Sequence, residues 1–422
     1  MARGEGGYRW LMLTLGWLIY FSFGLINTAI APLVAPIMGD LGLTYTQMGV
    51  IAGAWQLLYI FSAQPLGLAI DRLGAHRSLF LGAAVVSASS MLRFHATGFG
   101  DLFAYVALFG LGGPLISIGT SKLVSTWFSG EERGTASGIN ASGSAIGSMA
   151  ALALTNSLVL PLTGGWRNVF QAYGVFGFSV ALIWLVLGGR SPAAGLGPTE
   201  PSEHRRSGGA VRELLGHREI WLVVGIGVVF FLANHALQNW LPRMLELKGM
   251  SPADAGYATS LMALTGILGS LVVPRLAYRA ASMRSTIAAV ILLSGASILL
   301  IGAGGGPALL AGIASTGFFN RALLPVLMVA LMEMPEVGAE RMGTAGGLFF
   351  SVGEIGGFMG PFLMGYLKDL TGSFLAGILF LAVVTEASII AAFFIRTEVR
   401  RNGLDHHGGS DAGKPQTDGP VN

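Results

Sequence analysis

The stretch Gly67-Leu68-Ala69-Ile70-Asp71-Arg72-Leu73-Gly74-Ala75-His76-Arg77 joins two long apolar segments of the chain. Residues 45–70, which run into it, contain no Asp, Glu, Lys or Arg, and residues 78–98 after it contain only Arg93. A helix that crosses a membrane needs about 20 mostly apolar residues. Because the charges are confined to a short turn, this stretch predicts two membrane-spanning helices joined by a charged loop.

The composition extends this interpretation to the whole chain. Of the 422 residues, 53% are apolar and 11% are charged, against about 25% charged residues in an ordinary soluble domain. Charges this sparse cannot cover a globule in water, which disfavours a soluble enzyme, a nucleic-acid-binding protein and a disordered protein. The net charge is only +3, so no nucleic acid partner is expected, and the absence of cysteine excludes disulfides and thiolate metal sites.

Twelve segments are long and apolar enough to cross a membrane. Backbone groups in lipid must find their hydrogen-bond partners within the protein, so such segments form helices. The sequence therefore predicts an all-α membrane protein with the lipid bilayer as its surroundings. The expected spans are residues 10–33, 45–70, 78–98, 101–126, 135–160, 167–188, 219–241, 254–276, 285–304, 307–332, 343–366 and 373–396.

The distribution of Lys and Arg predicts the orientation, because cytoplasmic loops of membrane proteins are enriched in these residues. With the N-terminus inside, nineteen of the 25 lie on the cytoplasmic side, and Arg321 lies within a span. The outer side receives the remaining five, which are Arg93, Arg167, Arg243, Lys248 and Lys368. We expect a multi-pass protein of the plasma membrane, or of the inner membrane in a Gram-negative cell, with both termini in the cytoplasm.

The longest polar interruption divides the chain near its middle. Residues 189–218 are expected to form a cytoplasmic linker between an N-terminal six-helix bundle, 1–188, and a C-terminal six-helix bundle, 219–396. The tail, 397–422, is polar and Gly-rich and is expected to be disordered.

The two bundles repeat one sequence pattern. At an offset of 207 residues, Arg72 aligns with Arg279 and Arg77 aligns with Arg284. A duplicated six-helix unit is typical of secondary transporters, in which two similar bundles rock about one site between them. The expected fold is thus twelve transmembrane helices in two pseudo-symmetric six-helix bundles.

The charged loop resembles the G-x-x-x-D-R-x-G-R-R loop of the major facilitator superfamily. Gly67, Asp71, Arg72, Gly74 and Arg77 stand in the matching places, while a histidine replaces the first Arg of the final pair. The resemblance implies the major facilitator fold and a conformational latch formed by these five residues. The alternative is a basic loop that only fixes the orientation in the membrane.

Narrower likenesses point to several branches of that superfamily. The start, Glu5-Gly6-Gly7-Tyr8-Arg9-Trp10, and the pattern Trp127-Phe128-x4-Arg133-Gly134-x3-Gly138 resemble monocarboxylate and oxalate/formate carriers. Those carriers have an arginine inside the eighth helix, whereas residues 255–274 of the eighth expected span have no charge and Arg275 lies at its cytoplasmic end. Cyanate- and nitroimidazole-type permeases are equally plausible relatives.

Three full charges, Arg321, Glu354 and Glu386, lie near the middle of the last three expected spans. A charge at the centre of a membrane helix costs about 2.5–3.5 kcal/mol on insertion scales and therefore points to a function. Because consecutive helices of one repeat normally touch, we expect the three side chains to form one buried cluster. The cluster is a candidate proton site with Arg321 as an anion ligand, or else a permanent network that locks the bundle.

A second group of candidates is polar and neutral. His235 has Asn234 and Gln238 beside it in the seventh span, and the facing spans contribute Asn27, Gln56 and Tyr59. These side chains are candidates for binding the solute or coupling it to protons. The alternative is that they only cap uneven helix surfaces facing a cavity.

The sequence predicts secondary active transport of a small organic solute by alternating access, coupled to protons or to exchange. Arg321 and the partial carrier motifs favour an organic anion such as a monocarboxylate. The chain contains no G-x-x-x-x-G-K-[ST] motif and no metal-ligand spacing, so we expect no enzymatic activity and no cofactor. A monomer is expected. The alternatives are a drug or neutral-solute efflux carrier of the same superfamily and, more remotely, a membrane receptor or scaffold.

Overall fold

The computed structural model describes residues 5–188, 213–279 and 282–395, and these residues contain helices and no strand. The expected linker and tail therefore lie largely outside the described residues. The first group of elements is α1 (Glu5–Thr28), η1 (Ala31–Leu33), α2 (Val34–Leu41), α3 (Tyr45–Leu92), η2 (Arg93–His95), α4 (Phe99–Trp127), α5 (Gly130–Leu154), η3 (Thr155–Val159), α6 (Leu160–Thr163) and α7 (Trp166–Gly188). The second is α9 (Arg218–Leu247), α10 (Pro252–Arg279), α11 (Met283–Ala303), α12 (Gly306–Met332), α13 (Gly338–Thr371), α14 (Leu375–Ala387) and α15 (Ile389–Phe393).

The helices confirm an all-α membrane protein. Ten stretches of the described residues are helical, long and apolar enough to cross a membrane. The 48-residue α3 is not among them, but it bends at Gly74, where φ is 76° and ψ is 163°. At 1.5 Å per residue it is about 70 Å long, enough for two crossings of a hydrocarbon layer about 30 Å thick. The two arms of α3 therefore supply the second and third of the twelve expected spans.

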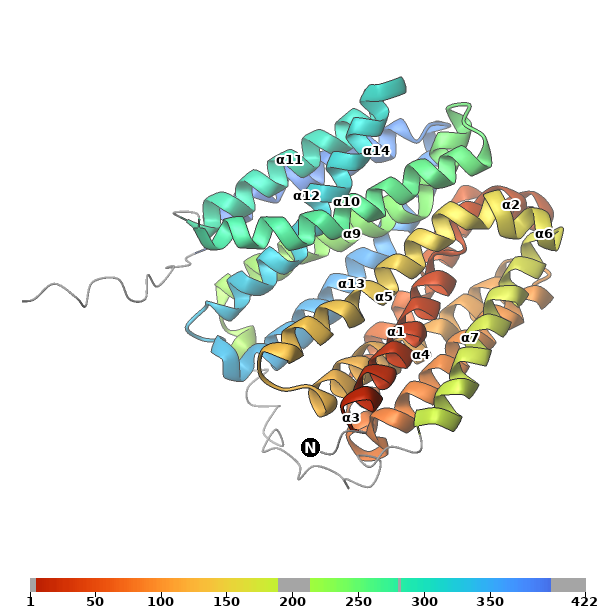
Figure 1. Ribbon diagram of the computed structural model, residues 1–422. Coiled ribbons are helices and arrows are strands. Elements are labelled where there is room, and N and C mark those ends of the chain that lie inside the picture. The colour runs from red at the N-terminus through yellow and green to blue at the C-terminus, as the bar shows by residue number, and fades with distance from the viewer. Residues whose placement is uncertain (1–4, 189–212, 280–281, 396–422) are drawn as a thin grey trace, which may run out of the picture.

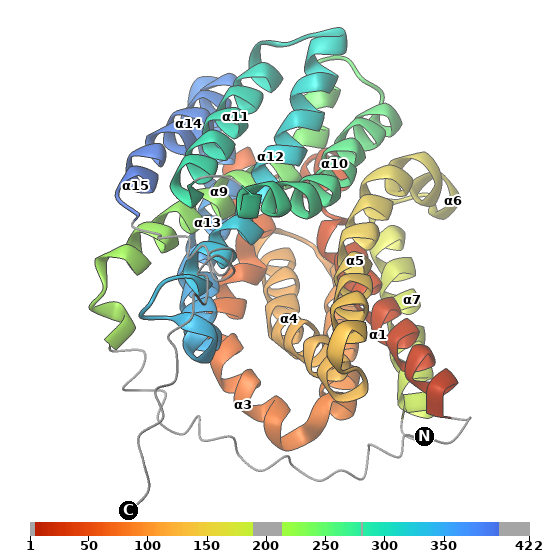
Figure 2. The ribbon, with the colours of Figure 1, turned by 60° about the vertical axis from the view of Figure 1, so that its left-hand side comes forward.

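The elements pack as two groups that meet along one face (Figure 1). Helices α1, α3, α4, α5 and α7 pack on one another and form the N-half, and α9 to α15 form the C-half in the same way. The halves touch where α3 lies against α13, where α5 lies against α10, and where α9 reaches η1. The second view separates the two groups along the same boundary (Figure 2).

The helices run between two ends of the molecule, called here the basic end and the opposite end. The basic end holds the start of α1, the bend at Gly74 and the start of α9 at Arg218. The opposite end holds the end of α1, the start of α3 and the end of α13. Both α1 and α9 run from the basic end to the opposite end.

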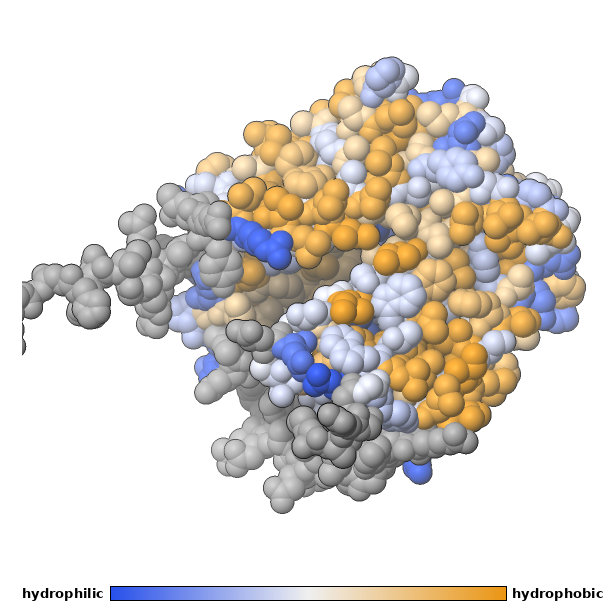
Figure 3. Space-filling view, in the orientation of Figure 1, coloured by the Kyte–Doolittle hydropathy of each residue, from blue (hydrophilic) through white to orange (hydrophobic). Residues whose placement is uncertain are grey.

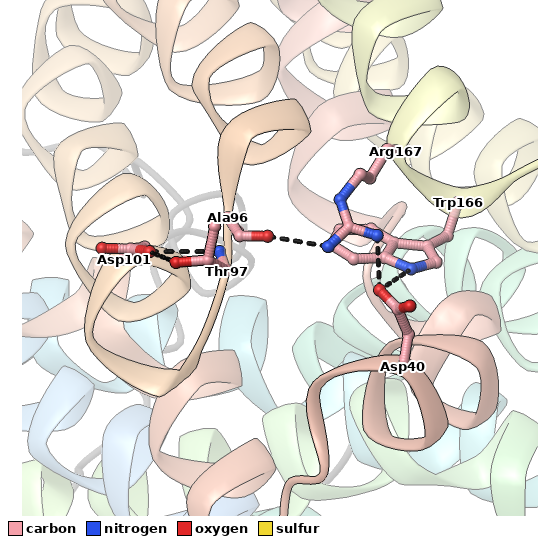
Figure 4. A network of polar contacts seen from close by, with 6 residues as sticks. All are labelled: Asp40, Ala96, Thr97, Asp101, Trp166 and Arg167. Atoms are coloured by element: carbon pink, nitrogen blue, oxygen red, sulfur yellow. Dashed lines mark hydrogen bonds and ion pairs between the residues drawn. The ribbon is translucent and has the colours of Figure 1, made fainter.

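A polar network fixes the opposite end of the N-half (Figure 4). Asp40 at the end of α2 accepts a hydrogen bond from Trp166 Nε1 at 3.2 Å and forms an ion pair with Arg167. Arg167 Nη2 also donates to the carbonyl of Ala96 at 2.8 Å. The first turn of α7 is thereby attached to the two connections beside it, so α7 is held firmly at this end.

The two halves are bound together at the opposite end. The Asp369 carboxylate, near the end of α13, accepts hydrogen bonds from the backbone N–H of Tyr45 at 3.2 Å and of Thr46 at 2.7 Å. Thr46 Oγ1 donates to the same carboxylate at 2.6 Å. Because these groups lie at the N-terminus of α3, where the helix dipole favours a negative charge, Asp369 holds the C-half to the N-half.

Glycines let the helices approach closely at this same end. A Cβ atom on Gly49 of α3 would overlap the backbone of Pro361 in α13, and one on Gly256 of α10 would overlap the carbonyl of Leu152 in α5. Close backbone approach at small residues is a common way for membrane helices to pack. Both inter-half contacts therefore depend on a residue without a side chain.

At the basic end the halves are apart. A Cβ atom on Gly134 or Gly138 in α5, or on Gly343 or Gly346 in α13, would meet nothing within 4 Å. The space-filling view shows the surface hollowed between the two halves (Figure 3). The structure is thus closed at the opposite end and has a cavity that opens toward the basic end.

Candidate functional site

Arg321 in α12 is the charged candidate for binding an anionic solute. Its side chain is partly exposed, and its Nη2 donates a hydrogen bond to Gln238 Oε1 at 2.9 Å. A Cβ atom on Gly266 of α10 would clash with Arg321 Cδ. The missing side chain at Gly266 therefore makes room for the arginine, which lies between α9, α10 and α12.

Gln238, the partner of Arg321, also forms a hydrogen bond with the N-half. Its amide Nε2 donates to Thr28 Oγ1 in α1 at 3.0 Å, and the side chain is buried. The chain Arg321–Gln238–Thr28 therefore connects α12, α9 and α1 and crosses the boundary between the halves. A guanidinium held by a neutral amide keeps its full positive charge, so it can bind an anion.

Glu354 in α13 pairs with His235 in α9. Glu354 Oε2 lies 3.5 Å from His235 Nε2, and the two side chains are 8% and 10% exposed. The imidazole stacks on Phe231 with ring centroids 6.0 Å apart, and Trp55 of the N-half meets its edge at 5.8 Å. A carboxylate and an imidazole in contact can share or exchange one proton, so this pair is a candidate proton site.

The neutral candidates on α3 lie around that pair. Gln56 Nε2 donates to the carbonyl of Gly357, one turn after Glu354, at 3.3 Å. A Cβ atom on Gly357 would clash with Glu354 Oε2, so this glycine leaves the carboxylate its space. Tyr59 lies 3.4 Å from Ser117 Oγ through its hydroxyl and interacts electrostatically with Glu354. The structure therefore brings Gln56, Tyr59, His235 and Glu354 together.

The expected cluster of Arg321, Glu354 and Glu386 does not form. Glu386 on α14 points to α11, where a Cβ atom on Gly295 would clash with its Oε1. Among the described residues, Arg321 forms no ion pair with either carboxylate. The physical reason is the order of packing: α14 lies on α11, and α9 supplies the partners of both Arg321 and Glu354. Adjacency in sequence therefore did not place the three charges on one surface.

Two further candidates lie beside these groups without joining them. Asn27 directly precedes Thr28, and Asn234 directly precedes His235. Both asparagines are partly exposed. Neither side chain forms a hydrogen bond with another described residue. Within the described part of the chain, no group of three or more His, Cys, Asp or Glu residues could hold a metal ion.

The proposed latch residues lie at the basic end. Gly74 adopts a positive φ and makes the bend in α3, while Arg72 and Arg77 are exposed. Gly67 faces α4, where a Cβ atom would lie 3.8 Å from Ile118 Cδ1. The side chain of Asp71 lies outside the described residues, so the role of the latch stays a prediction.

His76, the departure from the superfamily loop, packs inside the N-half. Its ring lies 5.4 Å from the Trp184 ring, and Trp184 Nε1 donates to the His76 carbonyl at 2.9 Å. Burial lowers the pKa of His76, and the neighbouring Arg77 lowers it further. The neutral imidazole is thus favoured, and this position contributes packing against Trp184.

Two charged residues gained their roles only from the structure. The sequence pattern does not single out Asp369, although this residue stands at the end of an apolar run, a suitable place for such a contact. Arg93 was assigned to the outer side but is only 2% exposed. Its guanidinium contacts the Ile26 carbonyl at 3.5 Å and Ser89 Oγ at 3.3 Å, and lies 5.0 Å from the centre of the Phe170 ring.

Comparisons with known proteins agree with this architecture. The chain is 25% identical over 411 residues to the "Probable galactarate/D-glucarate transporter GudP" of Escherichia coli (strain K12), covering 86% of this chain and 87% of that protein. It is 26% identical over 400 residues to the "Hexuronate transporter" of Bacillus subtilis (strain 168), covering 90% and 94%. A solved bacterial homolog of the human lysosomal transporter Spinster has the same fold, with a TM-score of 0.74 at 17% identity, covering 92% and 95%.

The family assignment follows from the match to a family model. The family model described as Major Facilitator Superfamily matches residues 16–361, which include both halves and most of the site described above. The loop at Gly67–Arg77, the twelve crossings and the two packed halves all agree with it. The protein is thus a multi-pass membrane protein that belongs to the Major Facilitator Superfamily, a family of transporters.

Proposed function

We propose that this protein is a secondary active transporter that moves a sugar acid with one carboxylate across the plasma membrane together with a proton. The observation that carries the proposal is Arg321, a partly exposed guanidinium whose side-chain partner is a neutral amide. The relatives reported above, named for hexuronate and for galactarate/D-glucarate transport, support an acidic sugar.

The charges of the site favour coupling to a proton. With Arg321 positive and Glu354 negative, the empty site is neutral. An anion adds one negative charge, which a water-poor membrane site resists. Protonation at the Glu354–His235 pair restores neutrality, so anion and proton bind more strongly together than separately. Tyr59 of α3 also interacts electrostatically with Glu354 and is a further titratable group near the pair.

The same charges favour a solute with one carboxylate over one with two. Arg321 can pair with a single carboxylate, and a second one would add negative charge to a site that already holds Glu354. Neutral polar side chains at Asn27, Asn234 and Gln56 suit sugar hydroxyls. The proposed solute class is therefore a uronate or an aldonate. This class replaces the simple monocarboxylate expected from the sequence, which the reported relatives do not support.

The orientation completes the proposal. The excess of Lys and Arg at the basic end supports a cytoplasmic location for that end and for both termini. With this sidedness, the structure is closed to the outside and its cavity opens inward. Release or binding of the solute on the cytoplasmic side is the step that this conformation serves.

Binding measurements on the purified protein test the choice of solute. Calorimetric titration would compare D-glucuronate, D-gluconate, galactarate, lactate and a neutral sugar. We expect the uronate or the aldonate to bind best, and Arg321→Leu to weaken that binding at least about 100-fold, since it removes a charge-assisted contact. Arg275→Leu is the matched control, because Arg275 is exposed and bonded to its own helix. Binding of only neutral or cationic amphiphiles, unchanged in Arg321→Leu, would contradict the proposal and favour a drug carrier.

A further inference from the structure

Gln238 holds groups from both halves with one amide. Its Oε1 accepts from Arg321 Nη2 at 2.9 Å, and its Nε2 donates to Thr28 Oγ1 at 3.0 Å. Thr28 is the last residue of α1 and is 1% exposed, and Gln238 is 7% exposed. A single buried side chain therefore joins the candidate anion ligand to the N-half at the closed end.

An anion would compete for one end of this amide. A carboxylate binds a guanidinium best through two parallel N–H groups. Nη2 belongs to both edges that offer such a pair, because the third edge is blocked by the arginine's own Cδ. Arg321 Nε, on one of these edges, is buried and has no hydrogen-bond partner in the structure. A carboxylate that satisfies Nε also accepts from Nη2 beside it, so it brings a second, negatively charged acceptor to the nitrogen that Gln238 Oε1 already accepts from.

Few other hydrogen bonds connect the halves, and they involve residues other than Gln238 and Arg321. Among the described residues, Asp369 holds the start of α3, and Asn156 Nδ2 donates to the Pro252 carbonyl at 3.3 Å. Gln56 reaches the Gly357 carbonyl beside Glu354. The bond from Gln238 to Thr28 differs from these because the same amide also accepts a hydrogen bond from Arg321 through its Oε1.

From this geometry we propose that Gln238 is the positioning residue that couples anion binding at Arg321 to opening of the opposite end. The proposal rests on the proposed function, in which Arg321 binds the carboxylate. In the empty protein, Gln238 takes the place of the anion on Nη2 and holds Thr28. When a carboxylate takes Nη2, the amide loses one of its two fixed partners, its orientation is released, and the bond to Thr28 weakens.

Spin-label distances across the opposite end test this coupling. The natural chain has no cysteine, so labels can be placed at Leu162→Cys in the N-half and Leu247→Cys in the C-half, which are 76% and 49% exposed. D-glucuronate is added in increasing amounts. We expect the anion to raise the population with the longer distance. In Thr28→Val, that population should be raised about tenfold relative to the closed one before any anion is added, because the closed state has lost an inter-half bond.

Thr259→Val is the matched control for Thr28→Val. Thr259 is also buried, but its hydroxyl bonds to the Ala255 carbonyl of its own helix at 2.8 Å. We expect this control to behave as the wild type. Gln238→Leu should leave the spin-label distances nearly insensitive to glucuronate, and Gln238→Glu should weaken binding, because a carboxylate would then compete permanently for Arg321.

The outcomes separate the two proposals. If glucuronate binds the wild type but Thr28→Val matches Thr259→Val, the coupling through Gln238 is wrong while the proposed function stands. Retention of the full anion response in Gln238→Leu would overturn the coupling in the same way. If neither glucuronate nor gluconate binds the wild type, the proposed function fails first, and the coupling fails with it.

Discussion

The two ends of the boundary between the halves are built from similar parts but are in opposite states. At the opposite end, Asp369 binds the start of α3, and Gly49 and Gly256 let backbones touch across the boundary. At the basic end, Gly134 of α5 and Gly343 of α13 face open space. The glycines at the basic end therefore have room for close helix contacts that this conformation does not make. Alternating access requires such contacts to form when the basic end closes.

Asp71 of the charged loop and Asp369 lie at the two different ends of the boundary between the halves. Asp369 lies near the end of α13 and holds the start of α3. Asp71 lies at the end of the first arm of α3, close to the bend at Gly74. Because α3 lies against α13, Asp71 is proposed to hold the start of α13 when the basic end closes. Each carboxylate would then stabilise one of the two conformations.

The largest effect is expected from covalently fixing the closed end. Thr46→Cys with Asp369→Cys, joined by a short bifunctional thiol reagent, should abolish transport in proteoliposomes and leave glucuronate binding from the basic end intact. Transport that persists after complete cross-linking would show that this end need not open. Ser251→Cys with Asp254→Cys is the control, because these residues form a similar contact within one half, and joining them should leave transport unchanged.

The next largest effect is expected from removing the charge of Asp369 or of Asp71, which should shift the conformational equilibrium in opposite directions. Asp369→Asn weakens a contact between a charge and a helix N-terminus, which is typically worth about 0.3–1 kcal/mol. It should raise the outward-open population about two- to fivefold, whereas Asp71→Asn should lower it. Spin-label distances across each end would measure both changes. Shifts in the same direction for the two variants would contradict the proposed opposite roles of Asp71 and Asp369. Asp101→Asn, which loses only a local contact with Thr97 in the N-half, should have no effect.

The smallest effects are expected from adding single methyl groups. Gly256→Ala would crowd the Leu152 carbonyl and should destabilise the present conformation by about 1–3 kcal/mol. Gly134→Ala meets no atom in this conformation and should be neutral or slightly stabilising, since alanine favours a helix by about 0.5–1 kcal/mol over glycine. Thermal unfolding in detergent would compare the two. Equal destabilisation by both variants would mean that the basic end is packed as tightly as the opposite end.

The sequence alone was sufficient for the architecture. Runs of about 20 apolar residues predict spans because the bilayer imposes their length, and the loop at Gly67–Arg77 carries the superfamily pattern. The bend at Gly74 and the all-helical fold agree with these predictions. Such features depend on local composition and on the membrane, so no knowledge of the packing was needed.

The partners of the buried charges could not be predicted in this way. Arg321 was expected to meet Glu354 and Glu386, but it binds Gln238, and Glu386 faces Gly295 on α11. Which face of each helix turns inward depends on tertiary packing that sequence adjacency does not give. A consequence is that Arg321→Leu and Glu354→Gln should have nearly additive effects on stability, since the two side chains share no bond.

We propose that the anion and one proton cross the membrane together at a site that is neutral when empty and when fully loaded. The decisive measurement is uptake of labelled glucuronate into proteoliposomes, with a pH gradient and a membrane potential imposed separately. We predict that the pH gradient alone drives accumulation, that the potential alone does not, and that Glu354→Gln removes the dependence on the pH gradient. Accumulation driven by the potential without a pH gradient, or an unchanged pH response in Glu354→Gln, would contradict the account.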